Sequence, residues 1–209
     1  DEEVAARLGS AATDAHKHTM AAALPLLATC SLLVDPSIGR RAALATVPAG
    51  IVAALGGTRE ARALSPCPPG ANNCLSTAAP SPVGKLATWK FPKGMDKAAA
   101  IDSLEKVLDS YPQAGQADVD KGGWSRVDDK LASAGYARLE FRSGLGNMAR
   151  FFNGGKPFVD DLELSVEDGF ACIRSSSRVG DSDLGVNKKR VNFIAAALRS
   201  SGWDAPDVQ

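Results

Sequence analysis

The C-terminal third of the chain holds a group of polar side chains whose types suit anion binding or proton transfer. A guanidinium group binds carboxylate or phosphate oxygens in a forked geometry. A carboxylate acts as a general acid or base when burial shifts its pKa. Together these side chains could hold an anionic ligand or polarise a carbonyl group. The candidate cluster comprises Asp160, Asp161, Glu163, Arg174, Arg178, Asp183, Asn187 and Arg190.

Other catalytic chemistry has weaker support in the sequence. Ser175, Ser176 and Ser177 supply hydroxyl groups, but a serine nucleophile needs a neighbouring base. The two histidines, His16 and His18, lie far upstream in a polar segment. The loop after the serines lacks the spacing of a phosphate loop, and its alternating aspartates lack the later glutamate of a calcium loop. We therefore predict no catalytic residue and no metal site.

Residues 158–190 predict a β-hairpin around which the rest of the chain is arranged. Asp168 and Gly169 are a strong turn signal, because both positions of a type I′ turn need positive φ. This turn places Leu164 opposite Ile173, and the alternation of side chains along each strand puts the apolar residues on one face. That face must be covered by other elements.

The same register pairs charged side chains on the opposite face of the hairpin. Glu163 lies opposite Arg174, and Asp161 lies opposite Ser176. Cross-strand pairs of opposite charge stabilise a register, and guanidinium–carboxylate bonds are among the stronger polar contacts. The first interpretation of the candidate cluster is therefore structural, as bridges that tie the following loop to the sheet.

Two amphipathic helices are predicted on either side of the strands in sequence. Residues 97–110 repeat apolar side chains at spacings of three and four, with Asp96 as the N-cap. Residues 186–201 show a similar pattern and form the closing helix. Asp183 or Asn187 is expected to cap that helix.

The strand and helix patterns together predict an α+β fold. Residues 135–143 alternate as a half-buried strand, a weaker strand signal spans residues 117–129, and residues 144–155 are expected to be irregular. Two helices on the apolar face of an antiparallel sheet make a two-layer domain. The other face is expected to carry Arg138, Glu140, Arg142, Asp161, Glu163 and Arg174.

The overall composition is that of a soluble globular protein. The chain has 209 residues, of which 44% are hydrophobic and 23% are charged, and both fractions are ordinary. A formal net charge of zero gives no support for nucleic-acid binding. No apolar run approaches the roughly 20 residues of a membrane span. We expect a globular domain over residues 89–209, preceded by a Pro/Ser-rich loop at 64–88 and an extension at 1–63.

Residues 1–63 contain features in the order of an export signal. Arg40 and Arg41 precede a moderately apolar run at residues 42–57 and a triplet of small side chains. Two interpretations stay open. The segment is a targeting or anchoring extension, cleaved or retained, whose apolar part contacts a membrane, or it is a buried or interfacial helical hairpin. An uncut helix over the apolar run would be about 24 Å long, which is short for spanning but sufficient for docking on membrane helices.

The four cysteines are too few for a disulfide scaffold. Cys67 and Cys74 bracket turn-forming residues, so they could close a small disulfide loop in an oxidising compartment or remain free thiols. Cys30 and Cys172 lie in apolar surroundings and are expected to pack as small hydrophobic residues.

Several motifs together resemble the domain of unknown function 1499 family. They cover roughly residues 64–203 and read CPPGANNC, EFRS, FVDDLEL and IRSSSRVGDSDLGVNKKRV. The resemblance implies occurrence in bacteria or plastids, and it supplies no established activity and no catalytic residue. The long alanine-rich front suits a plastid-type member. It indicates a location at the chloroplast thylakoid membrane, on the luminal side, with export to a bacterial periplasm as the alternative.

These observations favour a non-catalytic accessory subunit of a thylakoid membrane complex, such as a photosystem or its antenna. The expected partners are photosystem or light-harvesting subunits. No cofactor is predicted, and chlorophyll would be contacted only through those partners. The alternative is a small anionic-ligand binder or hydrolase, which needs a concave pocket walled by Asp161, Arg174 and Arg178.

Overall fold

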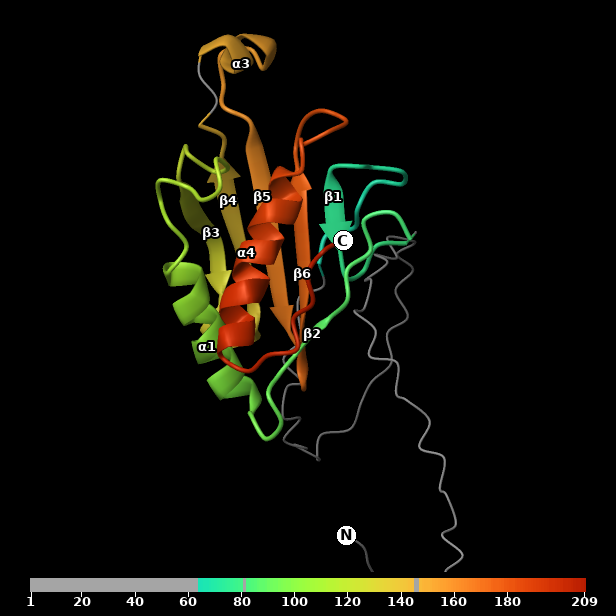
Figure 1. Ribbon diagram of the computed structural model, residues 1–209, viewed down its shortest axis with the longest axis vertical. Coiled ribbons are helices and arrows are strands. Elements are labelled where there is room, and N and C mark those ends of the chain that lie inside the picture. The colour runs from blue at the N-terminus through green and yellow to red at the C-terminus, as the bar shows by residue number, and fades with distance from the viewer. Residues whose placement is uncertain (1–63, 81, 145–146) are drawn as a thin grey trace, which may run out of the picture.

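The computed structural model describes residues 64–80, 82–144 and 147–209. The expectations for residues 1–63, namely the export-like signal, the apolar segment, the two histidines and Cys30, lie outside the described residues. Within the described ranges the chain forms two layers, an antiparallel sheet and a pair of helices (Figure 1). The expected α+β class is therefore confirmed.

The sheet contains six strands within the described residues, and every paired neighbour is antiparallel. The strand order is β1-β6-β5-β4-β3, and the short strand β2 pairs with the other end of β6. The strands are β1 (Cys74–Ser76), β2 (Trp89–Lys90), β3 (Trp124–Lys130), β4 (Tyr136–Arg142), β5 (Val159–Val166) and β6 (Phe170–Ser177).

The β5–β6 hairpin has the register that its turn predicts. Leu164 pairs with Ile173 and Glu163 pairs with Arg174. Gly169 adopts a φ of +91° at the turn, in the region that glycine enters without steric cost. Asp168 does not have a positive φ, so the type I′ geometry expected for this turn is wrong, although the turn position is right. Because one turn determines every later pair, this short signal correctly assigned the two faces of both strands.

Helices α1 (Lys97–Asp109) and α4 (Val186–Ser200) cover one face of the sheet (Figure 1). The Asp96 side chain caps α1 by accepting a hydrogen bond of 2.8 Å from the backbone N–H of Ala99. Leu104 of α1 and Ile194 of α4 are fully buried against the apolar side chains of the sheet. The predicted core between the two layers is thus confirmed.

Some local elements differ from the sequence prediction. Residues 144–155 contain the short helix α3 (Asn147–Phe152), where an irregular connection was expected, and α2 (Leu131–Ala134) was not predicted. The strand expected within residues 117–129 begins only at Trp124. Asp118 and Asp120 before it have positive φ values of 65° and 58°, so this stretch turns instead of extending.

Strands β1 and β2 were also not predicted from the sequence. β1 runs along one end of β6 and β2 along the other. Three and two residues are too few to show the alternation that reveals a strand. Both segments satisfy backbone groups of β6 that would otherwise lie at an open edge of the sheet.

Candidate functional site

The β5–β6 hairpin divides the predicted candidate cluster between the two faces of the sheet. Asp160 and Asp161 are adjacent on β5, so their side chains point to opposite faces. Asp160 contacts Arg190 beneath α4, whereas Asp161 contacts Arg178 on the other face. The structure therefore does not bring the eight residues into one site. We call the two groups the inner cluster (Tyr111, Asp120, Asp160, Ser175, Asn187 and Arg190) and the outer cluster (Arg138, Glu140, Asp161, Glu163, Arg174 and Arg178).

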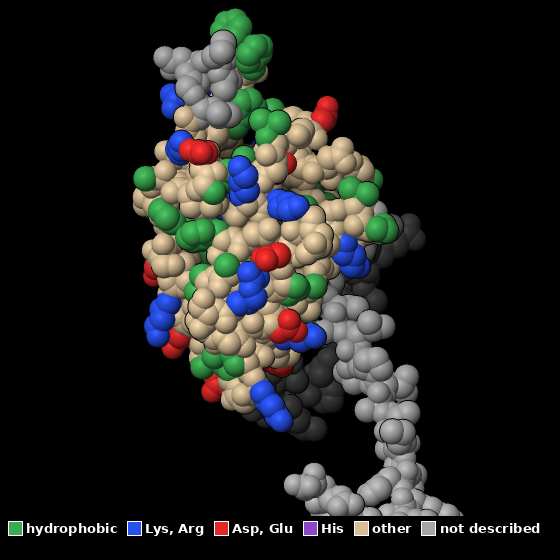
Figure 2. Space-filling model, viewed as in Figure 1, with side chains coloured by type: hydrophobic (Ala, Val, Ile, Leu, Met, Phe, Trp, Pro, Cys, Tyr) green, Lys and Arg blue, Asp and Glu red, His purple; other side chains and the backbone are tan. Residues whose placement is uncertain are grey.

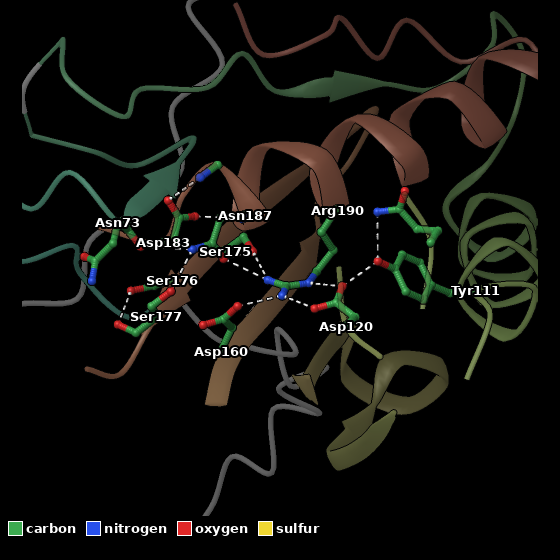
Figure 3. A network of polar contacts seen from close by, with 12 residues as sticks. Asn73, Tyr111, Asp120, Asp160, Ser175, Ser176, Ser177, Asp183, Asn187 and Arg190 are labelled. Atoms are coloured by element: carbon green, nitrogen blue, oxygen red, sulfur yellow. Dashed lines mark hydrogen bonds and ion pairs between the residues drawn. The ribbon is translucent and has the colours of Figure 1, made fainter. Parts of the chain in front are cut away.

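Arg190 is the centre of the inner cluster and is fully buried. Its Nε donates to Asp120 Oδ2 at 2.9 Å, and its Nη2 donates to Asp120 Oδ1 and to Asp160 Oδ2, the latter at 2.7 Å. Figure 3 shows the guanidinium between the two carboxylates. A buried cation is tolerated only when paired in this way.

The remaining donors of Arg190 face polar groups of the sheet and of its own helix. Nη1 donates to Ser175 Oγ at 3.0 Å and to Asn187 Oδ1 at 2.8 Å. A guanidinium has five N–H donors, and the five hydrogen bonds of Arg190 occupy them all. The Phe141 ring also lies 4.4 Å from the guanidinium carbon. Arg190 therefore has no donor left for a ligand.

The electrostatics of the inner cluster favour its ionised form. Burial alone would lower the pKa of Arg190, but the hydrogen bonds and charge of Asp120, together with the charge of Asp160, outweigh it and raise that pKa. Burial raises the pKa of Tyr111 above its usual range, and the nearby Asp120 carboxylate adds to this effect. The Tyr111 hydroxyl therefore stays protonated and donates a hydrogen bond to Asp120.

Asp120 is the charged residue of this cluster that the sequence analysis missed, and Tyr111, which binds it, was missed as well. Asp120 lies in a tight loop with a φ of +58°, a conformation that aspartate tolerates better than most residues. Gly115 allows the loop to close, because a Cβ there would lie 2.0 Å from the backbone oxygen of Val119. The available signal was Arg190 itself, a charge within the apolar stripe of a helix, which requires a buried acid. The stripe does not indicate which acid.

Asn187 connects α4 to β6 and to the residue that precedes β1. Its Oδ1 accepts from Ser175 Oγ at 2.6 Å, and its Nδ2 donates to the Asn73 carbonyl at 3.2 Å and to Ser177 Oγ at 3.1 Å. Asp183 accepts from the backbone N–H groups of Gly185 and Asn187 at 3.0 and 2.7 Å. The N-cap position of α4 is held by Gly185, which has no capping side chain, so the prediction that Asp183 or Asn187 is the N-cap is wrong. Asp183, two residues earlier, nonetheless satisfies one orphan donor of the first turn, the N–H of Asn187.

The outer cluster lies on the polar face that the sequence predicted. Arg178 binds both carboxylate oxygens of Asp161 at 2.8 Å and also reaches Glu140. Arg138 donates to Asp161 at 3.1 Å. Partial burial acts to raise the pKa of Asp161, but the hydrogen bonds and charge of Arg178 outweigh it and hold that pKa below its usual value. Asp161 is thus a stabilised anion, poorly suited to act as a base at neutral pH.

Glu163 and Arg174 form a second, more deeply buried pair in the outer cluster. Glu163 is 2% exposed and Arg174 is 9% exposed. Glu163 Oε1 accepts from Arg174 Nη1 at 2.9 Å, and its Oε2 accepts from the backbone N–H of Ser65 at 2.7 Å. Within the described part of the chain, Arg174 Nε is buried and has no hydrogen-bond partner. Among the described side chains of the two clusters, this N–H is the one buried donor left unused.

The cysteines of the described residues are oxidised. Cys67 and Cys74 form a disulfide with their Cα atoms 5.8 Å apart, which closes the loop before β1. Cys172 is also disulfide-bonded, so the expectation that it packs only as a small hydrophobic residue is wrong. Its apolar neighbours in the sequence correctly predicted that Cys172 is buried. They do not distinguish a free thiol from a disulfide sulfur.

The described residues form three grooves and no metal-binding group. Within the described ranges, no group of three or more His, Cys, Asp or Glu side chains could hold a metal ion. Three grooves lined by described residues run along α1, beside the C-terminal tail and along α4, with volumes of about 430, 410 and 520 Å³. Across residues 64–80, 82–144 and 147–209, no helix is both long and apolar enough to cross a bilayer.

Comparison with known proteins gives one match. The model of a family described as "Protein of unknown function (DUF1499)" matches residues 63–198, which include both clusters, the disulfide and most of α4. No curated protein and no solved structure matches the chain.

Proposed function

We propose, from the premise that the chain belongs to the DUF1499 family of proteins of unknown function, that it is a non-catalytic accessory subunit of a thylakoid membrane complex. The complex would be a photosystem or its antenna, and the chain would contribute a rigid domain that binds other subunits. The export-like order of residues 1–63 supports the compartment. The disulfide between Cys67 and Cys74 suits an oxidising lumen.

The observation that carries this proposal is the mutual neutralisation of the candidate groups. Arg190 directs its five donors to neighbouring side chains, and Asp161 has both oxygens bound to Arg178. A general acid or base must reach the substrate and hold a suitable pKa. Groups that bind each other so completely stabilise the fold and offer little to a substrate.

The test is affinity purification of the tagged full chain from membranes solubilised in a mild detergent. Mass spectrometry would identify the co-purifying proteins and would also read the mature N-terminus. Recovery of one set of membrane proteins, absent from an untagged control, supports the proposal. Recovery of the chain alone from gently solubilised membranes contradicts it.

A second candidate function is the binding of a small anion, with or without its hydrolysis. The unused Nε–H of buried Arg174 favours it, because buried donors normally have partners. Inorganic phosphate would be titrated calorimetrically into the full chain and into the Arg174→Lys variant, with Arg142→Lys, at a side chain 41% exposed, as a matched exposed control. Lysine keeps the charge but loses the forked geometry. Saturable binding that only Arg174→Lys removes supports this candidate, and the absence of heat in the wild-type chain contradicts it.

A further inference from the structure

The connection between β4 and β5 carries an exposed pair of aromatic side chains. Phe151 and Phe152 of α3 are 81% and 79% exposed, and their rings contact each other edge to face with centroids 5.9 Å apart. In Figure 1, α3 stands beyond the two layers at one end of the long axis, and Figure 2 shows hydrophobic side chains at that end. We call Arg150, Phe151, Phe152 and Lys156 the aromatic tip.

The aromatic tip belongs to one end of the sheet where exposed hydrophobic side chains gather. β4 ends, β5 begins and β6 ends at the same end of the sheet, because Arg142 pairs with Val159 and Asp160 pairs with Ser177. Two connections leave this end of the sheet, residues 143–158 and 178–185. They carry four of the six large hydrophobic side chains exposed in the described chain, namely Phe151, Phe152, Val179 and Leu184. Such clustering on a water-exposed end marks a contact surface.

The conformation of the aromatic tip is held by its own backbone. The N–H of Gly155 and the N–H of Asn153 both donate to the Arg150 carbonyl, at 2.7 and 3.0 Å, and Asn153 Nδ2 donates to the Pro157 carbonyl at 3.0 Å. A Cβ added at Gly154 or Gly155 would meet nothing within 4 Å. These hydrogen bonds fix the backbone of the tip, and the space beside both glycines is open.

The charges around the two phenylalanines indicate the occupant. Residues 143–158 contain Arg150 and Lys156 but no aspartate or glutamate. Aromatic side chains flanked by cations enter the interface of an anionic bilayer, where the rings are desolvated and the cations meet lipid phosphates. We propose that the aromatic tip inserts into the surface of an anionic lipid membrane.

A lipid surface fits the tip better than a protein surface does. Two phenylalanines can bury at most about 500 Å², whereas a stable protein interface needs roughly 800 Å² on each partner. Exposed Asp181 in the neighbouring connection sets a limit on depth, so that the tip alone enters the bilayer. This inference rests on the proposed function, which places the protein at a membrane. It adds which part of the globular domain contacts the lipid.

The test places a tryptophan at the tip of the full chain. Phe152→Trp and the matched control Val127→Trp, which changes a 41% exposed side chain on β3, would be mixed with phosphatidylglycerol vesicles whose acyl chains are brominated. Bromine quenches only an indole that enters the bilayer, and the signal of the three native tryptophans is subtracted with the wild-type chain. Because both variants keep residues 1–63, binding through those residues cannot distinguish them.

Two results together support the inference. The added indole of Phe152→Trp should be quenched while that of Val127→Trp is not, and Phe151→Ser/Phe152→Ser should bind vesicles about tenfold more weakly or worse. Arg150→Gln/Lys156→Gln should weaken binding about fivefold for each lost charge, and phosphatidylcholine vesicles should bind less.

Equal quenching of the two added indoles, quenching of neither, or no vesicle binding overturns the inference. If the added indole of Phe152→Trp stays unquenched while the serine variant loses its co-purifying membrane proteins, the tip binds protein. The accessory function then stands without the lipid contact.

Discussion

Replacement of Arg190 by methionine tests the structural role of the inner cluster. Methionine keeps much of the volume and the flexible stem of arginine but removes all five donors. Asp120, which is 3% exposed, and Asp160 would then share a pocket without a cation. Tyr111 would remain as a donor to Asp120, which compensates for only part of the loss.

The expected loss of stability is large because the pair is buried. Removing one partner of a buried ion pair costs about 3–5 kcal/mol, since the other charge stays uncompensated. A small domain is stabilised by about 5–15 kcal/mol in total, so Arg190→Met should fold but melt well below the wild type. Adding Asp120→Asn should cost less than the sum of the two single changes, with a coupling of about 1–3 kcal/mol.

Urea unfolding followed by tryptophan fluorescence measures these values. Trp124 is a local probe, because its indole N–H donates to the Tyr111 carbonyl at 3.0 Å and its ring stacks on Phe141. The matched control is Arg178→Met in the outer cluster, where the arginine is 39% exposed. Solvent screening limits the loss there to about 1 kcal/mol. Equal losses for the two variants, or a loss below about 1 kcal/mol for Arg190→Met, would refute the reasoning.

Three further predictions concern the outer cluster, the disulfide and one loop. Burial acts to raise the folded pKa of Asp161, but Arg178 outweighs it and depresses that pKa. The contribution of Asp161 to stability is therefore present above the unfolded pKa and lost as pH falls below about 4. In urea titrations at a series of pH values, Asp161→Asn should lose less stability than the wild type below this pH, and an equal loss would contradict this. Cys67→Ala/Cys74→Ala should lower the free energy of unfolding by about 2.5 kcal/mol through loop entropy, measured by denaturation without reductant, and an unchanged urea midpoint would count against it. Gly115→Ala should lower the melting temperature markedly, because its Cβ would overlap a backbone oxygen at a φ of +79°; a scanning-calorimetry trace that matches the wild type would show that the loop is not constrained.

The parts of the fold that the sequence predicted correctly depend on local signals. The Asp168-Gly169 turn determined the register of β5 and β6, and the repeat of apolar side chains determined α1 and the buried face of α4. β1 was missed because three residues show no period. Each correct assignment needed contacts only between neighbours in the chain or across one turn.

The candidate site was predicted less well because its partners are distant in sequence. Asp120 and Arg190 are 70 positions apart, and a loop with positive φ values, which the sequence presented as a broken strand, brings them together. The single cluster proposed for Asp160 and Asp161 conflicts with the alternation that correctly placed Leu162 and Leu164. The alternation was applied to Asp161 and Glu163 but not to Asp160, and applying it there would have separated the two aspartates.

The central claim, that the charged clusters brace a domain whose function is association, is tested most directly by sedimentation. Membranes solubilised in a mild detergent would be separated on a density gradient, and the chain located in the fractions by immunodetection. Both the wild type and Arg178→Gln should sediment with a large membrane assembly. A chain that stays at the top of the gradient, or an Arg178→Gln variant that is folded yet released from the assembly, would contradict the claim.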